Sequence, residues 1–195
     1  FDIEGVEHSR PFAKNQIEFT LTSQQVTIKG DVIQLTCSGN KLTQLDISQC
    51  PTLSAITCDR NELTALNLEH NTELSSVSCS DNQLSELNVT HNEELQALTC
   101  NNNNLSQLDL SHNLALLTLI CSSNQLSQLD FSHNPYFTTL WAASNKLTAL
   151  DFSHNPKLAS LVLLNNQIKG TSMDALIASL PATKGTLLGI SKTEE

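Results

Sequence analysis

One feature of the sequence limits the fold more than any other: a unit of 21 residues that recurs from about residue 32 to residue 168. Its clearest copy runs from Leu95 to Ala115 and reads LQALTCNNNNLSQLDLSHNLA. At one phase an asparagine recurs without insertion or deletion, in the row Asn40, Asn61, Asn82, Asn103, Asn124, Asn145 and Asn166. A strict period with apolar residues at fixed phases predicts a solenoid of stacked coils, each packing its inward side chains against its neighbours.

Two short stretches of each unit alternate apolar with polar residues. In the clearest copy they are 98–100, Leu-Thr-Cys, and 108–110, Leu-Asp-Leu. Alternation of this kind has the period of a β-strand, so each coil is expected to carry two strands that pair in parallel with those of the next coil. The sequence therefore predicts a mainly β solenoid with two short parallel sheets and no helices between the strands.

The asparagine row is expected to form the corners of the coils. No glycine occurs from Asn40 to Lys169, so the corners cannot use glycine where the backbone must be left-handed. Asparagine tolerates that conformation best among the other residues and also bonds nearby backbone amides. Its side chains are expected to be buried in the turn, where they need hydrogen-bond partners.

The whole unit resembles a known type of leucine-rich repeat. Its consensus, L-x-x-L-x-C-x-x-N-x-L-x-x-L-D-L-S-H-N-x-x, starts with the leucine-rich-repeat signature. It is similar to the short bacterial repeat sometimes called the IRREKO type, known from surface and secreted proteins of Bacteroidetes and from internalin-J-like proteins. The resemblance places the family's cysteine at Cys37, Cys58, Cys79, Cys100 and Cys121, and this row then continues as Ala142 and Leu163. It implies a right-handed leucine-rich-repeat solenoid in a secreted or cell-surface bacterial protein.

We expect a single domain over residues 1–195, with caps at both ends of the repeats at 32–168. In the N-terminal β cap, residues 1–31, the alternating runs 17–21 and 26–28 predict a strand pair that covers the first coil.

The C-terminal cap, residues 169–195, is expected to contain a helix and a strand. Thr171 to Asp174 resembles a capping box, and a helix is predicted over 172–180. Its apolar face is expected to consist of Met173, Leu176, Ile177 and Leu180. A last strand is predicted over 186–190.

The charge of the chain limits its partners. The net charge is -10, and between Asn61 and Asn145 there are nine acidic residues and no Lys or Arg. Such a chain is unsuited to nucleic acid or an anionic membrane surface. No apolar run is long enough to span a bilayer, so no membrane insertion by this segment is expected. Because the chain opens with Phe1, we expect a processed or trimmed product, and the resemblance to surface and secreted proteins implies that a signal peptide has been removed.

The cysteine row allows three interpretations. Neighbouring cysteines would lie about 4.8 Å apart with their side chains inside the coil. The preferred interpretation is that each fills core space as a small apolar residue, because free cysteine is among the most buried residue types. Disulfides or metal binding are the alternatives, but parallel neighbours aim both Cβ atoms the same way, which strains a bridge.

Two further polar rows run along the repeats. One is a row of histidines, which comprises His70, His91, His112, His133 and His154. Stacked imidazoles suit either a transition metal or a pH switch, but a surface turn is the preferred interpretation. The other is the carboxylate row, which comprises Asp46, Asn67, Asn88, Asp109, Asp130 and Asp151. Calcium is possible there but needs six or more oxygen ligands, so the preferred interpretation is that these side chains are solvated or bonded to amides. We therefore predict no metal and no cofactor.

The sequence favours binding over catalysis. It contains no H-E-x-x-H, G-x-S-x-G or Walker A motif, and we predict that the chain is not an enzyme. The first hypothesis is an extracellular scaffold that binds a protein or a glycan through the strand face. The alternative is a structural spacer that presents another domain at the cell surface. A spacer should have uniform side-chain rows, whereas a binder should have one place where a row changes character.

Such a change occurs near the C-terminal end of the repeats. The outward row of the first strand reads Thr36, Thr57, Ser78, Thr99, Ile120, Trp141 and Val162, and the row two positions on ends in Ala143 and Leu164. Since adjacent coils lie about 4.8 Å apart, these apolar residues should form one exposed area, which usually marks an interface. We predict partner binding, or weak self-association, at Ile120, Trp141, Ala143, Val162 and Leu164.

Overall fold

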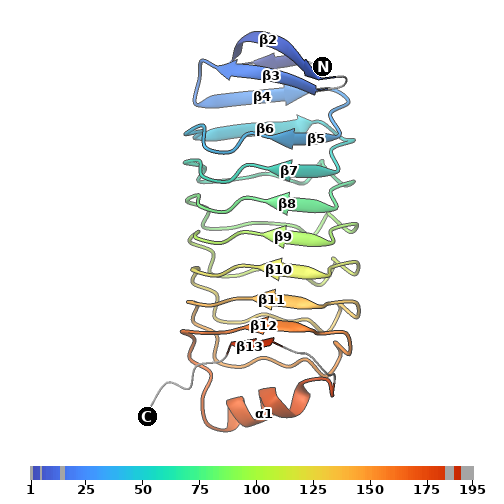
Figure 1. Cartoon of the computed structure of the whole chain (residues 1–195), viewed down its shortest axis with the longest axis vertical. Helices are drawn as coiled ribbons and strands as arrows, with labels where there is room; N and C mark the ends of the chain where they lie inside the picture. Colours follow the sequence, from blue (N-terminus) through green and yellow to red (C-terminus); the bar gives the residue numbers. More distant parts are fainter. Residues whose placement is uncertain (1, 5, 14–15, 183–186, 190–195) are drawn as a thin grey trace.

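The computed structural model describes residues 2–4, 6–13, 16–182 and 187–189. It is an elongated stack of coils with strands at one end and a helix at the other (Figure 1). The main sheet has eight parallel strands in the order β13-β12-β11-β10-β9-β8-β7-β5. These strands are β5 (Gln34–Thr36), β7 (Ala55–Thr57), β8 (Ser76–Ser78), β9 (Ala97–Thr99), β10 (Thr118–Ile120), β11 (Thr139–Trp141), β12 (Ser160–Val162) and β13 (Leu187–Gly189). The predicted mainly β leucine-rich-repeat solenoid is confirmed.

The register of this sheet follows the sequence period. From β5 to β12 each residue pairs with the residue 21 positions away, so Ile120 faces Trp141 and Trp141 faces Val162. The strand centres point inward, and Leu98, Leu119 and Leu140 are fully buried. Near the C-terminal end, the core is filled by rings, with Phe131 stacked on Phe137 at a centroid distance of 4.3 Å and on Phe152 at 5.5 Å. The core is therefore one continuous column along the stack.

The second parallel sheet predicted for every coil is wrong beyond the first coil. Only β6 (Gln44–Gln49) forms a strand in that position among the described residues, and it pairs with β4 (Gln25–Lys29). In the later coils, asparagine side chains donate hydrogen bonds to the backbone carbonyl groups that pairing between parallel strands would otherwise use. Asn113 Nδ2, for example, donates to the carbonyl oxygens of Val89 at 2.9 Å and Asn92 at 2.8 Å. These side-chain bonds link the coils without regular strands.

Those asparagines form a second row that is completely buried. Each one has no exposed surface and donates to two carbonyl groups of the preceding coil, while its own Oδ1 has no hydrogen-bond partner among the described residues. The row comprises Asn71, Asn92, Asn113, Asn134 and Asn155. The asparagine is therefore needed for its NH₂ group, which a carboxylate does not provide.

The left-handed corner falls one residue earlier than predicted. Positive φ angles occur at Arg60, Asp81, Asn102, Ser123, Ser144 and Asn165, and at Gly39 and Lys41 in the first coil. The asparagine that follows each of these six residues is not left-handed, so that part of the prediction is wrong. The asparagine side chain instead closes the corner by bonding backbone groups of its own coil and of the neighbouring coil, as Asn103 does with Cys100 and Leu84.

The predicted burial of the asparagine row holds for its interior members. Asn61, Asn82, Asn103, Asn124 and Asn145 are buried. Asn103 Nδ2 donates to the carbonyl oxygens of Cys79 at 3.0 Å and Cys100 at 3.2 Å. The two ends differ, because Asn40 is exposed and Asn166 is half-buried. Asn40 lies in the first coil, so no earlier repeat supplies the carbonyl group that the interior members bond.

The N-terminal cap contains the predicted strands with different partners. β3 (Gln16–Leu21) pairs antiparallel with β2 (Val6–Ala13), whereas β4 pairs antiparallel with β1 (Asp2–Glu4) and parallel with β6. The expected pairing of β3 with β4 is therefore wrong. β4 serves as the cover, because its alternation buries Val26 and Ile28 against the first coil.

The C-terminal cap matches the expected helix and strand. α1 (Thr171–Ser179) buries Met173 and Leu176, but Ile177 is 56% exposed and Leu180 is half-buried. The predicted capping box is absent, because Gly170 occupies the N-cap and no side chain caps the helix. Ser179 joins the helix to the last coil by accepting the N–H of Phe152 at 3.0 Å. β13 lies within the predicted strand, whose residues 186 and 190 fall outside the described ranges.

Candidate interaction surface

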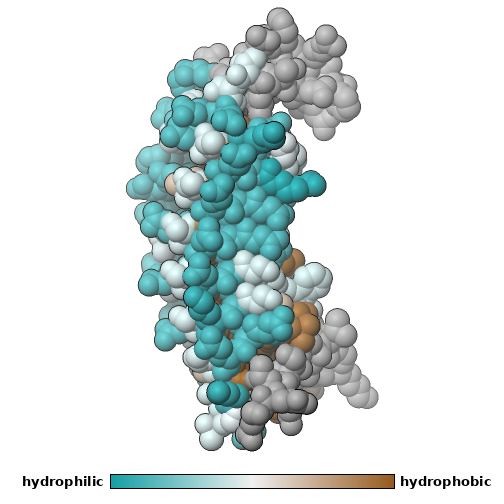
Figure 2. All heavy atoms as spheres, turned by 90° about the vertical axis from the view of Figure 1, so that its left-hand side faces the viewer, coloured by the Kyte–Doolittle hydropathy of each residue, from teal (hydrophilic) through white to brown (hydrophobic). Residues whose placement is uncertain are grey.

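The predicted apolar residues lie together on the strand face of the last three repeats. Ile120, Trp141 and Val162 are aligned across β10, β11 and β12. Trp141 is 43% exposed and Leu164 is 41% exposed, while Ile120, Ala143 and Val162 are half-buried. In Figure 2 the strand face forms the right-hand edge, where hydrophobic atoms gather toward the C-terminal end. These five residues are called the strand-face patch below.

The Trp141 ring is held in place from the next coil. Its indole N–H donates to the Ser160 hydroxyl at 3.0 Å. A tryptophan with its polar group satisfied and its ring exposed offers a large rigid contact area at little entropic cost. The residues that precede it in the same row, Thr57, Ser78 and Thr99, have side chains too small to do this.

A row of polar acceptors ends where the patch begins. Along one line, the side-chain oxygen of each residue accepts the backbone N–H of its counterpart in the next coil. Asp59 bonds Ser80 at 2.7 Å, Ser80 bonds Asn101 at 3.1 Å, Asn101 bonds Ser122 at 2.7 Å and Ser122 bonds Ala143 at 3.2 Å. Ala143 has no side-chain acceptor for the following residue, Leu164. The polar chain therefore stops at the coil where apolar residues replace it.

Further apolar residues lie at the corner that precedes each strand, which we call the strand-start corner. One row there reads Thr72, Glu93, Leu114, Pro135 and Pro156, and the next reads Glu73, Glu94, Ala115, Tyr136 and Lys157. Leu114 is 57% exposed, Tyr136 52% and Leu117, just before β10, 38%. Lys157 Nζ lies 4.5 Å from the centre of the Tyr136 ring. These residues were not predicted from the sequence, although both rows change from acidic to apolar along the repeats.

The cysteines belong to the core. Cys58, Cys79, Cys100 and Cys121 are buried, Cys37 is half-buried, and all five are free thiols. Burial raises the pKa of Cys37 and of Cys121 to about 12, with the Asp59 carboxylate adding to the effect at Cys37. These thiols are poor nucleophiles at neutral pH. Cys50, outside the row, is also free and buried, and its Sγ lies 3.1 Å from the Ile28 carbonyl oxygen.

The aspartate and histidine rows form surface turns. Asp109 Oδ1 accepts the backbone N–H of Ser111 at 2.9 Å and its hydroxyl at 2.7 Å, and the hydroxyl oxygen lies 3.0 Å from His112 Nδ1. These two bonds hold the pKa of Asp109 below its ordinary value. Asn88 accepts the same bonds from Thr90. The preferred interpretation of this row, carboxylates bonded to amides, is confirmed.

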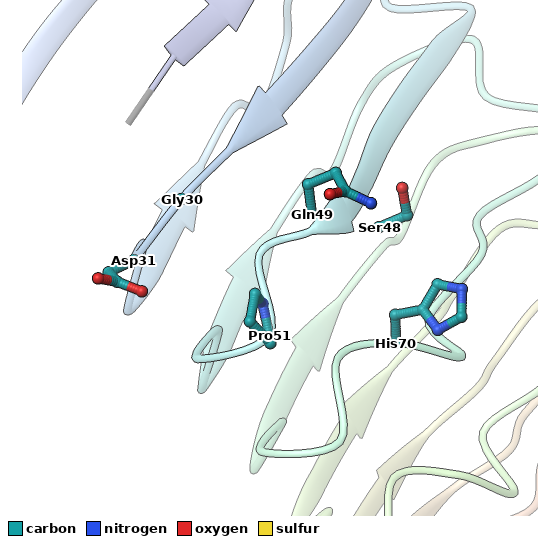
Figure 3. A pocket seen from close by; sticks show the side chains of 6 residues that line it. All are labelled: Gly30, Asp31, Ser48, Gln49, Pro51 and His70. Atoms are coloured by element: carbon teal, nitrogen blue, oxygen red, sulfur yellow. The ribbon is translucent and has the colours of Figure 1, made fainter.

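An open hollow near the first coil is lined by Gly30, Asp31, Ser48, Gln49, Pro51 and His70 (Figure 3). It lies near the N-terminal end of the stack, whereas the strand-face patch lies near the other end. Within the described ranges, no three His, Cys, Asp or Glu side chains are placed to hold a metal ion. No helix there is long and apolar enough to cross a membrane.

Solved structures of bacterial proteins share this fold. The functional domain of InlJ from Listeria monocytogenes, described as including a cysteine ladder, is 36% identical with a TM-score of 0.67, over 69% of this chain and 30% of the InlJ chain. The internalin InlF from the same organism is 20% identical with a TM-score of 0.64, over 76% and 50% of the two chains. A leucine-rich-repeat protein of Leptospira interrogans is 19% identical with a TM-score of 0.61, over 80% and 48%.

This chain spans half or less of the length of each of these three chains. No protein-family model and no curated protein matches the sequence. The likeness to InlJ nevertheless extends to the cysteine row, which here occupies the same phase of five successive repeats. With its 21-residue period and its in-register parallel sheet, the chain is a bacterial leucine-rich-repeat protein.

Proposed function

We propose that this chain is a non-catalytic binding scaffold that holds a protein partner on the strand face, with Trp141 at the centre of the contact. The observation that carries the proposal is the change of row at β10–β12, from small hydroxyl side chains to Ile120, Trp141 and Val162. A soluble surface rarely gathers such residues without a use for them. Tryptophan is also enriched among the residues that dominate binding energy at interfaces.

The resemblance of the repeats to those of bacterial surface and secreted proteins supports an extracellular or cell-surface location. The buried free thiols fit that environment, because dry thiols with raised pKa values resist oxidation. A glycan partner is less well supported than a protein, since the strand-face patch is built mainly from aliphatic side chains around a single indole. The net charge of -10 opposes nucleic acid as a partner.

A photo-crosslinking amino acid at two positions tests this function. Thr118 lies on the strand face beside Ile120, and Gln128 is exposed elsewhere on the coil. Exposed to proteins from the surface of its own cell, the Thr118 variant should form a discrete crosslinked product that is lost when Trp141 is replaced by alanine. The Gln128 variant should form none. Equal crosslinking at both positions, or at neither, would favour the spacer over the binding scaffold.

A further inference from the structure

The strand-start corner changes its chemistry at the same coil as the strand face. Before β8 and β9 it carries the exposed carboxylates Glu73, Glu93 and Glu94. Before β10 and β11 it carries the exposed apolar side chains of Leu114 and Tyr136. An acidic half and an apolar half therefore meet on one edge of the solenoid.

This edge lies within reach of anything bound to the strand-face patch. Leu117 begins the approach to β10 and lies three residues before Ile120, a separation of about 10 Å along an extended chain. A stable protein interface uses about 20 to 30 residues on each side. Since the strand-face patch has only five residues, a partner that covers it must also contact neighbouring surface, and Leu117 leads directly to the strand-start corner.

The carboxylates of this corner lack nearby cations. Between Asn61 and Asn145 the sequence has nine acidic residues and no Lys or Arg. Within the described ranges no basic side chain lies at ion-pair distance from Glu73, Glu93 or Glu94. Lys157, the one basic residue in the two corner rows, lies over the Tyr136 ring instead. The negative charge of the corner is thus left for a partner to complement.

We propose that the partner's contacting segment carries an apolar anchor flanked by Lys or Arg. The anchor packs on the strand-face patch and on Leu117, and the cations lie over the carboxylates before β8 and β9. This inference rests on the proposed function and adds the chemistry of the partner. Complementary charge at the rim of an interface raises the association rate and selects among partners, and both effects weaken with salt. A second copy of this chain, with a net charge of -10, complements these carboxylates less well than a basic segment does.

Selection of a phage-displayed peptide library on the folded chain tests the chemistry. Peptides that bind should combine aromatic or aliphatic residues with Lys or Arg, and Trp141→Ala should abolish their enrichment. A synthetic peptide from the selection should bind at least about fivefold more weakly at 300 mM than at 50 mM salt, because exposed charges are screened at that ionic strength.

Two double variants, matched in charge, separate this inference from the proposed function. Glu73→Gln with Glu94→Gln should weaken the binding of the peptide about fivefold and remove most of the salt dependence of that binding. Glu62→Gln with Glu86→Gln, also exposed but outside the corner, should leave the affinity and its salt dependence unchanged. Peptides without basic residues that bind all variants alike would overturn the inference and leave the scaffold function intact. Enrichment that Trp141→Ala does not reduce would overturn the strand-face function itself. A dimer in sedimentation analysis that Trp141→Ala dissociates would assign the patch to a second copy and refute the inference.

Discussion

Asn103 Oδ1 accepts the backbone N–H of Leu84, in the preceding coil, at 3.0 Å. The same amide group donates to Cys79 and Cys100, so one buried side chain joins two coils and closes a corner. Asn103→Ala would leave these groups unpaired and should lower the free energy of unfolding by roughly 1 to 3 kcal/mol. Asn104 is exposed, and its replacement by alanine should change stability by less than about 0.5 kcal/mol. Urea denaturation of both variants checks this, and equal losses would contradict the assigned roles.

The second asparagine row predicts a different dependence on charge. Asn113 donates to Val89 and Asn92 and has no exposed surface. Asn113→Asp replaces both N–H donors by a buried carboxyl group beside two carbonyl oxygens, and this environment raises the pKa of that carboxyl group. A raised folded-state pKa means that stability is retained below the unfolded pKa of about 4 and lost as pH rises above it. Asn113→Asp should therefore be less stable than Asn113→Ala at pH 7, with the difference shrinking toward pH 4. A difference independent of pH would refute this account.

The left-handed corners offer a site for stabilisation. Ser123 has a φ of 57°, a conformation that costs a residue with a Cβ roughly 1 kcal/mol or more. Ser123→Gly should raise the free energy of unfolding by about 0.5 to 1 kcal/mol, because the flexibility of glycine in the unfolded chain offsets part of the gain. Ser127 is exposed and has no positive φ, so Ser127→Gly should destabilise the protein. Thermal denaturation of the pair tests the sign, and a loss at both positions would be inconsistent with strain at Ser123.

The buried thiols make the fold sensitive to alkali. Burial raises the pKa of Cys121 from its ordinary 9.0 to about 12. Above pH 9 the unfolded chain loses this proton while the folded protein keeps it, so stability falls between about pH 9 and 12. Each such thiol lowers the free energy of unfolding by up to about 1.4 kcal/mol per pH unit over this range. Cys121→Ala should therefore flatten the decline, and Ser122→Ala, which removes no titrating group, should not. Parallel pH profiles for the wild type and Cys121→Ala would disprove a buried, protonated thiol.

Thiol labelling probes the same row at neutral pH. Cys58, Cys79, Cys100 and Cys121 should resist modification without denaturant, because they are buried and protonated. Cys37 is half-buried and should be the first member of the row to react. Mass spectrometry after timed labelling identifies the order, and rapid labelling of two or more of the four interior thiols would contradict the assigned burial.

The single tryptophan of the chain reports on the strand-face patch. Its emission should be quenched by acrylamide in the native state, since 43% of the residue is exposed. Ser160→Ala removes the acceptor of the indole N–H and should lower fluorescence anisotropy while leaving the melting temperature nearly unchanged. Native emission that acrylamide cannot quench would show that Trp141 is covered.

The strict period explains why so much of the main sheet was predictable. A fixed step of 21 residues sets the parallel register, and alternation within each unit identifies the inward Leu98 and Cys100 and the outward Thr99. The exposed position of Trp141 follows from the same alternation. These features depend on contacts between neighbouring coils that repeat along the chain, so each copy supplies the same information.

Features that depend on specific side-chain geometry were not predictable in this way. The pattern of 108–110 has the period of a strand, but the amide of Asn134 takes the Leu110 carbonyl group, and period alone does not show this competition. The left-handed position of the repeat is occupied by residues as different as Arg60 and Ser144. The preference of asparagine for this conformation therefore pointed to the wrong position. The cap strands pair outside the repeat, where no neighbouring copy shows the partner. The strand-start corner was not predicted, because its change of residue type lies outside the alternating strand stretches.

The affinity of one selected partner, protein or peptide, for three forms of the chain tests the central claim most directly. The forms are the wild type, Trp141→Ala and Thr99→Ala, the last truncating an earlier position of the same outward row. If Trp141 is the centre of the binding surface, its removal should weaken binding at least about tenfold, or 1.4 kcal/mol, while Thr99→Ala stays within about twofold of the wild type. Wild-type affinity in the Trp141→Ala form, with the fold intact by circular dichroism, would contradict the claim.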